Sequence, residues 1–336
     1  MRKIMKTLEK NRGFTIVELL TVMSIIIILI SLLVPAMNKA RIFAKEVMQK
    51  NQFKAIGTAV EMYRNEFEEY PESSYDDSTT VPGTTFAYCG AMKLAEAVLG
   101  QDLVGFHPYS RFRSDYLDGQ GNVLYDTDPT DGTLPNDYNL ELREGPYLDV
   151  GSANAHRLWN VYGGPGSDTS PPQNLGGFSS MAFVILDVYT RVDNFSAAGK
   201  SYIGMPVLYY RANTNGIGHP HFVNDDPMQG PAPIPPLNPS TASSLYYNYQ
   251  DNDMLVQMGM PWNPAGLPHQ MDSRGLNTGK NPPLDQSSAY FFYHDTYDKN
   301  VPLATGRPHN PDSFILLSAG YDGEYGTSDD ITNFPQ

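Results

Sequence analysis

Cysteine is nearly absent from this chain, since Cys89 is the only one among 336 residues. A single thiol cannot form an intramolecular disulfide, and it excludes a zinc site built on cysteines. A lone cysteine usually behaves as a small apolar side chain. We therefore expect Cys89 to be buried and structural rather than reactive.

Basic residues are scarce after the first thirteen positions. The chain has a net charge of −14, yet residues 1–13 contain five basic residues and one acidic residue. The remainder is therefore strongly acidic and would repel a phosphate backbone, which argues against nucleic-acid binding. Acidic clusters of this kind are better suited to divalent cations.

Catalytic motifs are also lacking. The sequence contains no G-x-S-x-G elbow and no phosphate-binding loop. Its seven histidines are scattered, and neither "HPH" (His219, His221) nor "HD" (His294, Asp295) has a metal-ligand spacing. A triad assembled across distance would leave no such motif, but nothing here favours one. We expect a protein that is not an enzyme.

One long apolar run is present, from Phe14 to Val34, with Glu18 as its only charge. Its 21 residues can cross about 30 Å of hydrocarbon as a helix. A secretory signal peptide would have a shorter apolar core of about 7–15 residues. A simple membrane anchor leaves Glu18 unexplained, because a charge within a span is costly and usually marks a function.

The residues before the run suggest a third interpretation. A basic leader, Gly13, Phe14, three further residues and Glu18 form a single pattern, "GFTIVELLTVMSIIIILISLLVP". This stretch resembles the class III leader of type IV pilins and of type II secretion pseudopilins. The resemblance implies that a prepilin peptidase cuts between Gly13 and Phe14 and methylates the new Phe14 amine. Pro35 stands where that family often has a helix-kinking proline.

Physical chemistry agrees with the resemblance. In a staggered fibre, Glu18 of one subunit can neutralise the Phe14 amine of its neighbour, and two charges in lipid are tolerable only when they are paired. We expect Glu18 to be an assembly contact. The basic residues before the span favour a cytoplasmic N-terminus, although four more follow it.

The helix is predicted to continue past the membrane. Apolar residues recur at helical spacing from Ala36 to Phe67, and Pro71 ends the run. The segments we expect are a cleaved leader at 1–13, a transmembrane helix at 14–34, its extramembrane continuation at 35–70 and a C-terminal domain at 71–336. The fold class is α+β and pilin-like, with the long helix packed on an antiparallel sheet and with large loop-rich insertions.

The body should be rich in loops, because the chain has 29 glycines and 27 prolines. Apolar spacing predicts a short helix at 86–100. Residues 180–192, 204–213, 289–295 and 313–320 read as strands. Six prolines between Pro227 and Pro239 predict an extended loop or linker.

The C-terminal stretch "SFILLSAGYDGEYGTSDDITNF" predicts a cation-binding loop over 318–331. Adjacent carboxylates repel unless a cation holds them, and calcium accepts six to eight oxygens in loose geometry. The pattern resembles the calcium loop of the major pseudopilin of type II secretion. That resemblance implies carboxylate ligands from Asp322, Asp329 and Asp330 and backbone ligands from Ala319 and Glu324. The alternative is that these are solvated turn residues.

A second acidic stretch at 115–137 has irregular spacing. It could bind another cation, but an exposed acidic loop is the simpler interpretation. Its aspartates are Asp115, Asp118, Asp126, Asp128, Asp131 and Asp137.

The leading hypothesis is a type II secretion pseudopilin in the bacterial inner membrane, with its C-terminal domain in the periplasm. Its partners would be other pseudopilins, the prepilin peptidase and the inner-membrane secretion platform. One alternative is a type IV pilin or minor pilin of a surface filament used in adhesion, motility or DNA uptake. Another is a binding module carried on a pilin-like stalk.

Overall fold

The computed structural model contains the whole chain, and a subset of its residues is described here. The described residues are 15–75, 86–125, 137–162, 174–175, 177–179, 181–193, 201–216, 245–262, 269, 271, 289–301 and 307–335. Gly13, Phe14 and the proline-rich stretch 227–239 lie outside these ranges. The expected cleavage site and linker therefore stay predictions.

A single long helix, α1 (Ile16–Phe67), opens the described chain. It continues through Pro35, which lacks a backbone N–H to donate to the helix. The chain divides into two compact units, Met1–Lys45 and Glu46–Gln336. The predicted helical stretch up to Phe67 is confirmed.

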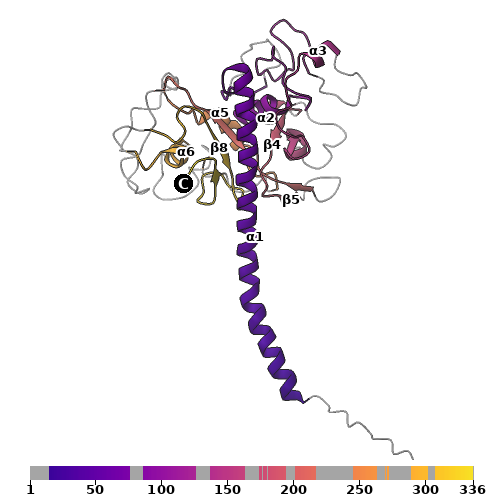
Figure 1. Cartoon of the computed structure of the whole chain (residues 1–336), viewed down its shortest axis with the longest axis vertical. Helices are drawn as coiled ribbons and strands as arrows, with labels where there is room; N and C mark the ends of the chain where they lie inside the picture. Colours follow the sequence, from indigo (N-terminus) through magenta and orange to yellow (C-terminus); the bar gives the residue numbers. More distant parts are fainter. Residues whose placement is uncertain are drawn as a thin grey trace, which may run out of the picture. The chain divides into compact units, whose positions relative to one another are not determined.

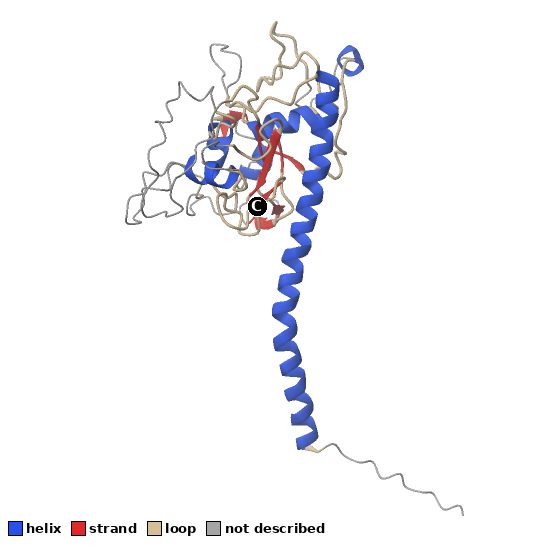
Figure 2. Cartoon of the chain, turned by 60° about the vertical axis from the view of Figure 1, so that its left-hand side comes forward, coloured by secondary structure: helices blue, strands red, loops and turns tan. Residues whose placement is uncertain are grey.

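The second half of α1 belongs to the core of the larger unit. Its buried apolar residues recur at helical spacing, namely Phe53, Ile56, Ala59, Val60 and Tyr63. The first four share one apolar cluster with side chains of α2 (Gly90–Leu99), β7 (Leu208–Arg211) and β8 (Phe314–Ser318), and Tyr63 belongs to a second, larger cluster. Figures 1 and 2 show this half of α1 beside α2 and these strands.

Helix α2 is buried along its whole length. It packs on β4 (Phe183–Ile185) and β7 and lies within the predicted helical stretch 86–100. Gly100 ends it with a positive φ of 85°, and its N–H donates to the Glu96 carbonyl over 2.7 Å. A side chain at Gly100 would also meet the Gly105 carbonyl oxygen at 2.1 Å, so only glycine fits this turn.

The strands form small antiparallel sheets, which confirms the α+β class. A three-stranded sheet has the order β7 (Leu208–Arg211), β8 (Phe314–Ser318) and β9 (Ile331–Thr332), with Tyr209 opposite Leu316. The other pairs are β1 (Ala155–Arg157) with β4 (Phe183–Ile185), β2 (Asn174–Leu175) with β3 (Phe178–Ser179), and β5 (Arg191–Asp193) with β6 (Ser201–Ile203). Three further helices are α3 (Asp137–Glu141), α4 (Leu158–Tyr162) and α5 (Gln250–Val256).

The strand predicted at 289–295 is wrong, because this stretch is helix α6 (Ala289–Thr296). Its buried residues Phe292, Tyr293 and Thr296 follow helical spacing, and the Thr296 hydroxyl donates to the Phe292 carbonyl over 2.6 Å. Phe292 lies 4.5 Å from the ring of Tyr210. This tertiary contact outweighs the β-propensity of the aromatic residues.

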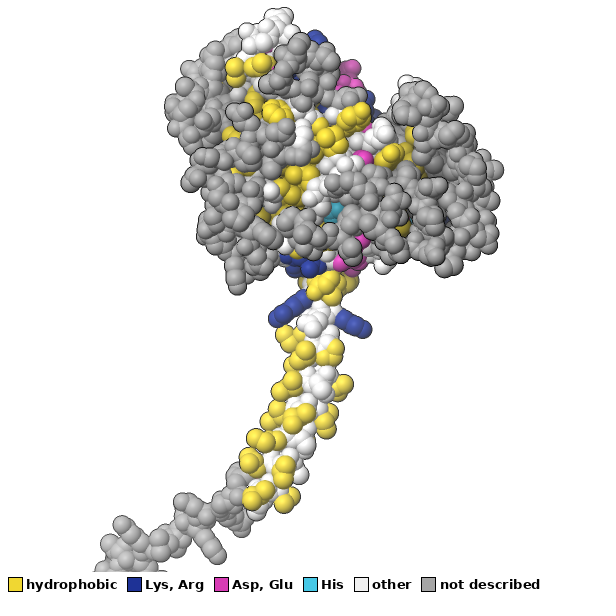
Figure 3. Space-filling model, turned by 180° about the vertical axis from the view of Figure 1, so that it is seen from behind, with side chains coloured by type: hydrophobic (Ala, Val, Ile, Leu, Met, Phe, Trp, Pro, Cys, Tyr) yellow, Lys and Arg dark blue, Asp and Glu magenta, His cyan; other side chains and the backbone are white. Residues whose placement is uncertain are grey.

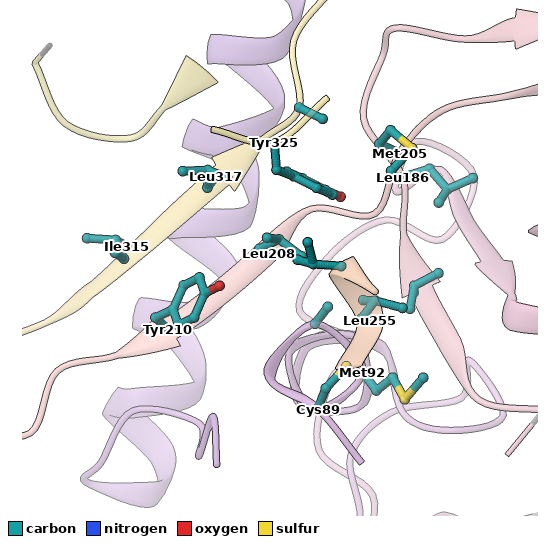
Figure 4. Close-up of a cluster of buried hydrophobic side chains, with 14 of the residues drawn as sticks. Cys89, Met92, Leu186, Met205, Leu208, Tyr210, Leu255, Ile315, Leu317 and Tyr325 are labelled. Atoms are coloured by element: carbon teal, nitrogen blue, oxygen red, sulfur yellow. The ribbon is translucent and has the colours of Figure 1, made fainter. Parts of the chain in front are cut away.

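The larger apolar cluster joins segments that are far apart in the sequence. Figure 4 shows side chains of α2, β7, β8 and α5 pointing toward one another, among them Met92, Leu208, Leu255 and Leu317. Cys89 is fully buried in the same cluster, and burial raises the pKa of its thiol to about 11. The predicted burial of this cysteine is confirmed.

Candidate functional site

The first described turn of α1 is capped by its own residues. The Glu18 carboxylate accepts the Thr15 backbone N–H over 2.9 Å and the Thr15 hydroxyl over 2.8 Å. The Glu18 N–H is 3.2 Å from the Thr15 hydroxyl oxygen. Such a reciprocal pair is a capping box, which satisfies N–H groups left without partners at a helix start. Glu18 therefore also stabilises the beginning of the helix.

The same part of α1 has the length and polarity of a membrane span. Its 18-residue apolar window has no buried residue, and it is the one such helix among the described residues. Large apolar side chains from Ile16 to Val34 are exposed, and Figure 3 shows apolar side chains along this part of the helix. Exposed apolar surface of this extent is compatible with lipid or with packing between helices.

The predicted cation loop connects β8 to β9 and turns on glycines. Gly320, Gly323 and Gly326 have φ values of 62°, 75° and 91°. A Cβ at Gly320 would lie 2.2 Å from the Asp329 carbonyl oxygen. Glycine is therefore required where the two sides of the loop approach each other.

The loop brings two of the three predicted carboxylates together. The Asp322 N–H donates to Asp329 Oδ2 over 2.9 Å, and the Thr327 hydroxyl donates to Asp329 Oδ1 over 2.6 Å. Burial raises the pKa of Asp322, and the negative charge of Asp329 raises it further. Burial opposes ionisation of Asp329 as well, yet the hydrogen bonds from Thr327 and Asp322 leave its pKa below the usual value.

Asp330 takes a different position. It is 3 % exposed, and its Oδ2 accepts the Gly326 N–H over 2.8 Å inside the loop. Its Oδ1 is buried without a hydrogen-bond partner in the described structure, and burial raises its pKa. Among the described residues, no three His, Cys, Asp or Glu side chains are grouped closely enough to hold a metal ion.

The two predicted backbone ligands already accept hydrogen bonds within the loop. The Ala319 carbonyl accepts the Gly323 N–H over 3.1 Å, and the Glu324 carbonyl accepts the Thr327 hydroxyl over 3.2 Å. A carbonyl oxygen has two lone pairs, so neither bond prevents coordination. The donor set that fits a hard cation best is therefore the Asp322–Asp329 pair with carbonyl oxygens of this loop.

A buried aspartate that the sequence reasoning missed positions the loop. Asp187 is fully buried; its Oδ1 accepts the N–H groups of Tyr189 and Met205 over 3.1 Å, and its Oδ2 accepts the Ser318 hydroxyl over 2.9 Å. The Ser318 oxygen in turn accepts the Gly320 N–H over 3.3 Å. The available signal was a lone carboxylate following the apolar strand "FVIL", since buried charges need dedicated partners.

The other side of the loop rests on the body of the protein. The Arg191 guanidinium lies over the Trp262 ring at 5.3 Å and over the Tyr321 ring at 5.7 Å, and it donates to the Tyr321 carbonyl. A Cβ at Gly323 would meet the Trp262 ring at 2.5 Å. Residues far away in the sequence therefore fix the loop.

The second acidic stretch is only partly described. Asp115 pairs with the buried guanidinium of Arg113. Asp118 accepts the N–H groups of Gln120 and Asn122 over 2.7 and 2.8 Å. Both carboxylates thus have local partners. Asp126, Asp128 and Asp131 lie outside the described residues, as does the side chain of Asp137. A second cation site stays a prediction.

Comparison with known proteins identifies the class of the N-terminal segment. A family model described as the prokaryotic N-terminal methylation motif matches residues 9–34. No curated protein and no solved structure matches the chain. The match supports a type IV pilin-like class III leader. With the single apolar helix, it supports a membrane-anchored, pilin-like filament subunit with a structural rather than a catalytic role.

Proposed function

We propose that this chain is a pseudopilin, a structural subunit of the short periplasmic fibre of a type II secretion system. The observation that carries the proposal is the methylation motif at residues 9–34, with Glu18 at the start of an exposed apolar helix. The glycine-rich loop that joins β8 to β9 and pairs Asp322 with Asp329 supports it further. The fibre would do mechanical work by assembling, and the chain itself would catalyse no reaction.

Processing and placement follow from the same proposal. A prepilin peptidase would remove residues 1–13 and methylate the Phe14 amine. The helix would span the bacterial inner membrane once, with its N-terminus in the cytoplasm and the unit from Glu46 onward in the periplasm. The inner-membrane secretion platform and other pseudopilins would be its partners.

Glu18 would act twice in this scheme. In the precursor its carboxylate caps α1 through Thr15. In the fibre it would pair with the Phe14 amine of a neighbouring subunit. A charged pair in lipid is stable only while both partners are present, so this contact would favour the assembled state.

We also propose that the loop binds calcium through Asp322, Asp329 and the carbonyl oxygens of Ala319 and Glu324. The negative charge of Asp329 raises the pKa of Asp322, and a divalent cation beside the two carboxylates would relieve that repulsion. Asp330 would contribute mainly by holding Gly326, and its second oxygen is available inside the loop. Bound calcium would stabilise the connection between β8 and β9.

Thermal unfolding tests the calcium proposal. Millimolar calcium should raise the melting temperature of the full chain, and a chelator should reverse the rise. Asp329→Ala with Asp330→Ala should abolish the increase. Asp118→Ala is the matched control, because Asp118 lies in a separate turn and its loss should leave the calcium increment intact. A melting curve that does not respond to calcium or chelator would refute the site.

Deletion of the gene separates the two filament hypotheses, since the leader is common to both. We expect the loss of protein secretion with surface filaments unaffected. Loss of surface filaments with normal secretion would instead identify a pilin. Complementation with the intact chain controls for effects on neighbouring genes.

A further inference from the structure

A large polar cavity lies in the unit Glu46–Gln336, and its described lining residues do not include the C-terminal loop. Its volume is about 1240 Å³, and the described residues that line it are 107–111, 118–124, Asn139 of α3 and Leu142. Pockets that hold one drug-sized ligand usually measure about 300–1,000 Å³. This cavity therefore has room for a ligand of more than one ring.

The wall of the cavity is held by a buried ion pair. The Arg143 guanidinium donates to both Asp102 carboxylate oxygens over 2.8 and 2.9 Å, and the two side chains are 2 % and 5 % exposed. Arg143 also donates to the carbonyls of Gly105 and Leu124 over 3.0 and 2.6 Å. These bonds clamp the two ends of the lining segment, so the cavity is preorganised rather than formed by the ligand.

His107 supplies a hydrogen-bond donor with no partner. The residue is 1 % exposed and lines the cavity, and its Nδ1 accepts the Tyr109 N–H over 3.2 Å. Burial lowers the pKa of His107, and the Arg143 charge lowers it further, so the ring is neutral with its proton on Nε2. That Nε2 is buried without a hydrogen-bond partner among the described residues. An unmet buried donor is costly, and a ligand oxygen would satisfy it.

The facing wall is a rigid turn rich in polar groups. Asp118 Oδ1 accepts the N–H groups of Gln120 and Asn122, and Asp118 Oδ2 accepts the Asn122 side-chain amide over 2.7 Å. Leu117 and Val123 pair across the turn as an antiparallel bridge. Residues 118–122 of this turn line the cavity.

An exposed aromatic ring completes the lining. Tyr109 is 62 % exposed, and its ring centre lies 5.6 Å from the His107 ring. The negative face of such a ring attracts the slightly positive C–H groups of a sugar ring. Among the described residues of the lining, Arg111 and Asp118 are the charged ones, and their charges offset each other.

We propose that this cavity binds a neutral oligosaccharide, with the hydroxyl groups hydrogen-bonded by His107 and the 118–122 turn and one sugar face against Tyr109. A polar, nearly charge-neutral cavity with an aromatic wall suits a ligand that combines many hydroxyls with apolar C–H faces. The proposal does not depend on the assignment to a secretion fibre, because none of these residues belongs to the leader or the C-terminal loop.

The test uses the full chain in phosphatidylcholine nanodiscs, since glycoside detergents would compete with the ligand. Linear tri- to hexasaccharides of glucose, galactose, mannose and N-acetylglucosamine are the probes, with saturation-transfer NMR and calorimetry as readouts. At least one series should bind saturably. Tyr109→Ala should weaken it about tenfold, while Tyr75→Ala, an exposed tyrosine outside the cavity, should leave binding unchanged.

His107→Asn is the second variant. The Asn side chain can still accept the Tyr109 N–H while the Nε2 donor is lost, so binding should fall about tenfold with an unchanged melting temperature. Failure of every saccharide to bind would overturn the proposal. So would binding that survives both variants, or a preference for inorganic phosphate over all neutral probes.

Discussion

Glu96 is the buried carboxylate that ties helix α2 to the cavity-bearing segment. It is 1 % exposed and accepts the Tyr88 hydroxyl and the Gln101 amide, each over 2.8 Å, and the Ser110 hydroxyl. Burial raises the pKa of Glu96 from its usual value near 4.5, and the three hydrogen bonds only partly offset that rise. Ionised Glu96 therefore lowers the stability of the fold.

The sign of the pH dependence follows. The folded state binds the Glu96 carboxyl proton more tightly than the unfolded chain does. The stability that this protonated carboxyl contributes is therefore lost as the pH rises from about 4.5 through the folded pKa. Glu96→Gln removes the titration while keeping a similar shape. Relative to the natural chain, the variant should gain about 1.4 kcal/mol for each pH unit within that window.

Denaturant unfolding between about pH 4 and pH 8, followed by the fluorescence of the two tryptophans, measures this difference. The comparison between variant and natural chain at each pH cancels the contributions of other groups. A difference in unfolding free energy that stays constant across the range would contradict the prediction. Asp118→Asn serves as a control, since Asp118 is exposed and its pKa lies below the usual value.

At the scale of elements, Gly90 of α2 and Gly57 of α1 are two helical glycines whose surroundings differ, so replacing each by alanine should have opposite effects on stability. A Cβ at Gly90, the first residue of α2, would lie 2.3 Å from the Tyr209 carbonyl oxygen and 3.0 Å from the Asn252 amide. Gly90→Ala should therefore destabilise the fold by about 1–3 kcal/mol. A Cβ at Gly57 in α1 would meet only the Phe314 ring at 3.9 Å, so Gly57→Ala should stabilise by about 0.5–1 kcal/mol.

Urea unfolding of both variants checks this pair of opposite signs. If Gly90→Ala and Gly57→Ala lowered the free energy of unfolding equally, the close packing of α2 on β7 would not be the reason that position 90 excludes a side chain. The two glycine variants also report how firmly α2 is held against β7. Asn252 of α5 joins these two elements, since it donates to the Tyr209 carbonyl and accepts the Ala91 N–H, each over 2.8 Å.

Elements with strong periodicity were predictable from the sequence. The apolar spacing of α1 and α2 identifies both helices, because the second half of α1 buries one face and α2 is buried along its whole length. α6 was not predictable, since "AYFFYHD" has strand-forming residues and only the packing of Phe292 on Tyr210 selects a helix. The stretches 204–213 and 313–320 contain β7 and β8, which are shorter than predicted; in the first, Pro206 cannot donate to a ladder. The stretch 180–192 contains β4 and the first part of β5 instead of one strand.

The candidate site was predictable to a similar degree. Composition locates the C-terminal loop, because glycines and aspartates mark a tight acidic turn. The grouping of Asp322 with Asp329 and Asp330 was implied by the family resemblance, and the structure brings Asp322 and Asp329 together. The separate burial of Asp330 was not predictable, and neither was the chain from Asp187 through Ser318 to Gly320. The contact between Asp187 and Ser318 joins residues 131 positions apart, which no local pattern indicates.

At the scale of the whole molecule, the large body is part of the core rather than an appendage. Asp251 of α5 accepts the Ser73 hydroxyl just beyond the end of α1, and Asn252 connects α2 to β7. Tyr247 donates to the carbonyls of His309 and Asn310 shortly before β8. Deletion of the segment around α5 would therefore expose the apolar cluster and unfold the unit instead of trimming it.

Assembly of the fibre is the last prediction, and three variants separate the two roles of residue 18. Glu18→Ala removes both the helix cap and the charge. Glu18→Gln keeps a capping-box residue but removes the charge. Thr15→Ala keeps the charge but removes the cap, which costs about 1 kcal/mol.

If the charge pairs with a neighbouring Phe14 amine, Glu18→Ala and Glu18→Gln should both be inserted and cleaved yet fail to assemble. Thr15→Ala should still assemble. Cleavage is measured by the loss of 13 residues from the precursor, and assembly by the yield of sheared fibres from cells that overproduce the subunit. Normal fibres from Glu18→Gln, together with poor fibres from Thr15→Ala, would show that helix capping and not charge pairing is what assembly needs, because a neutral amide cannot neutralise an ammonium in lipid.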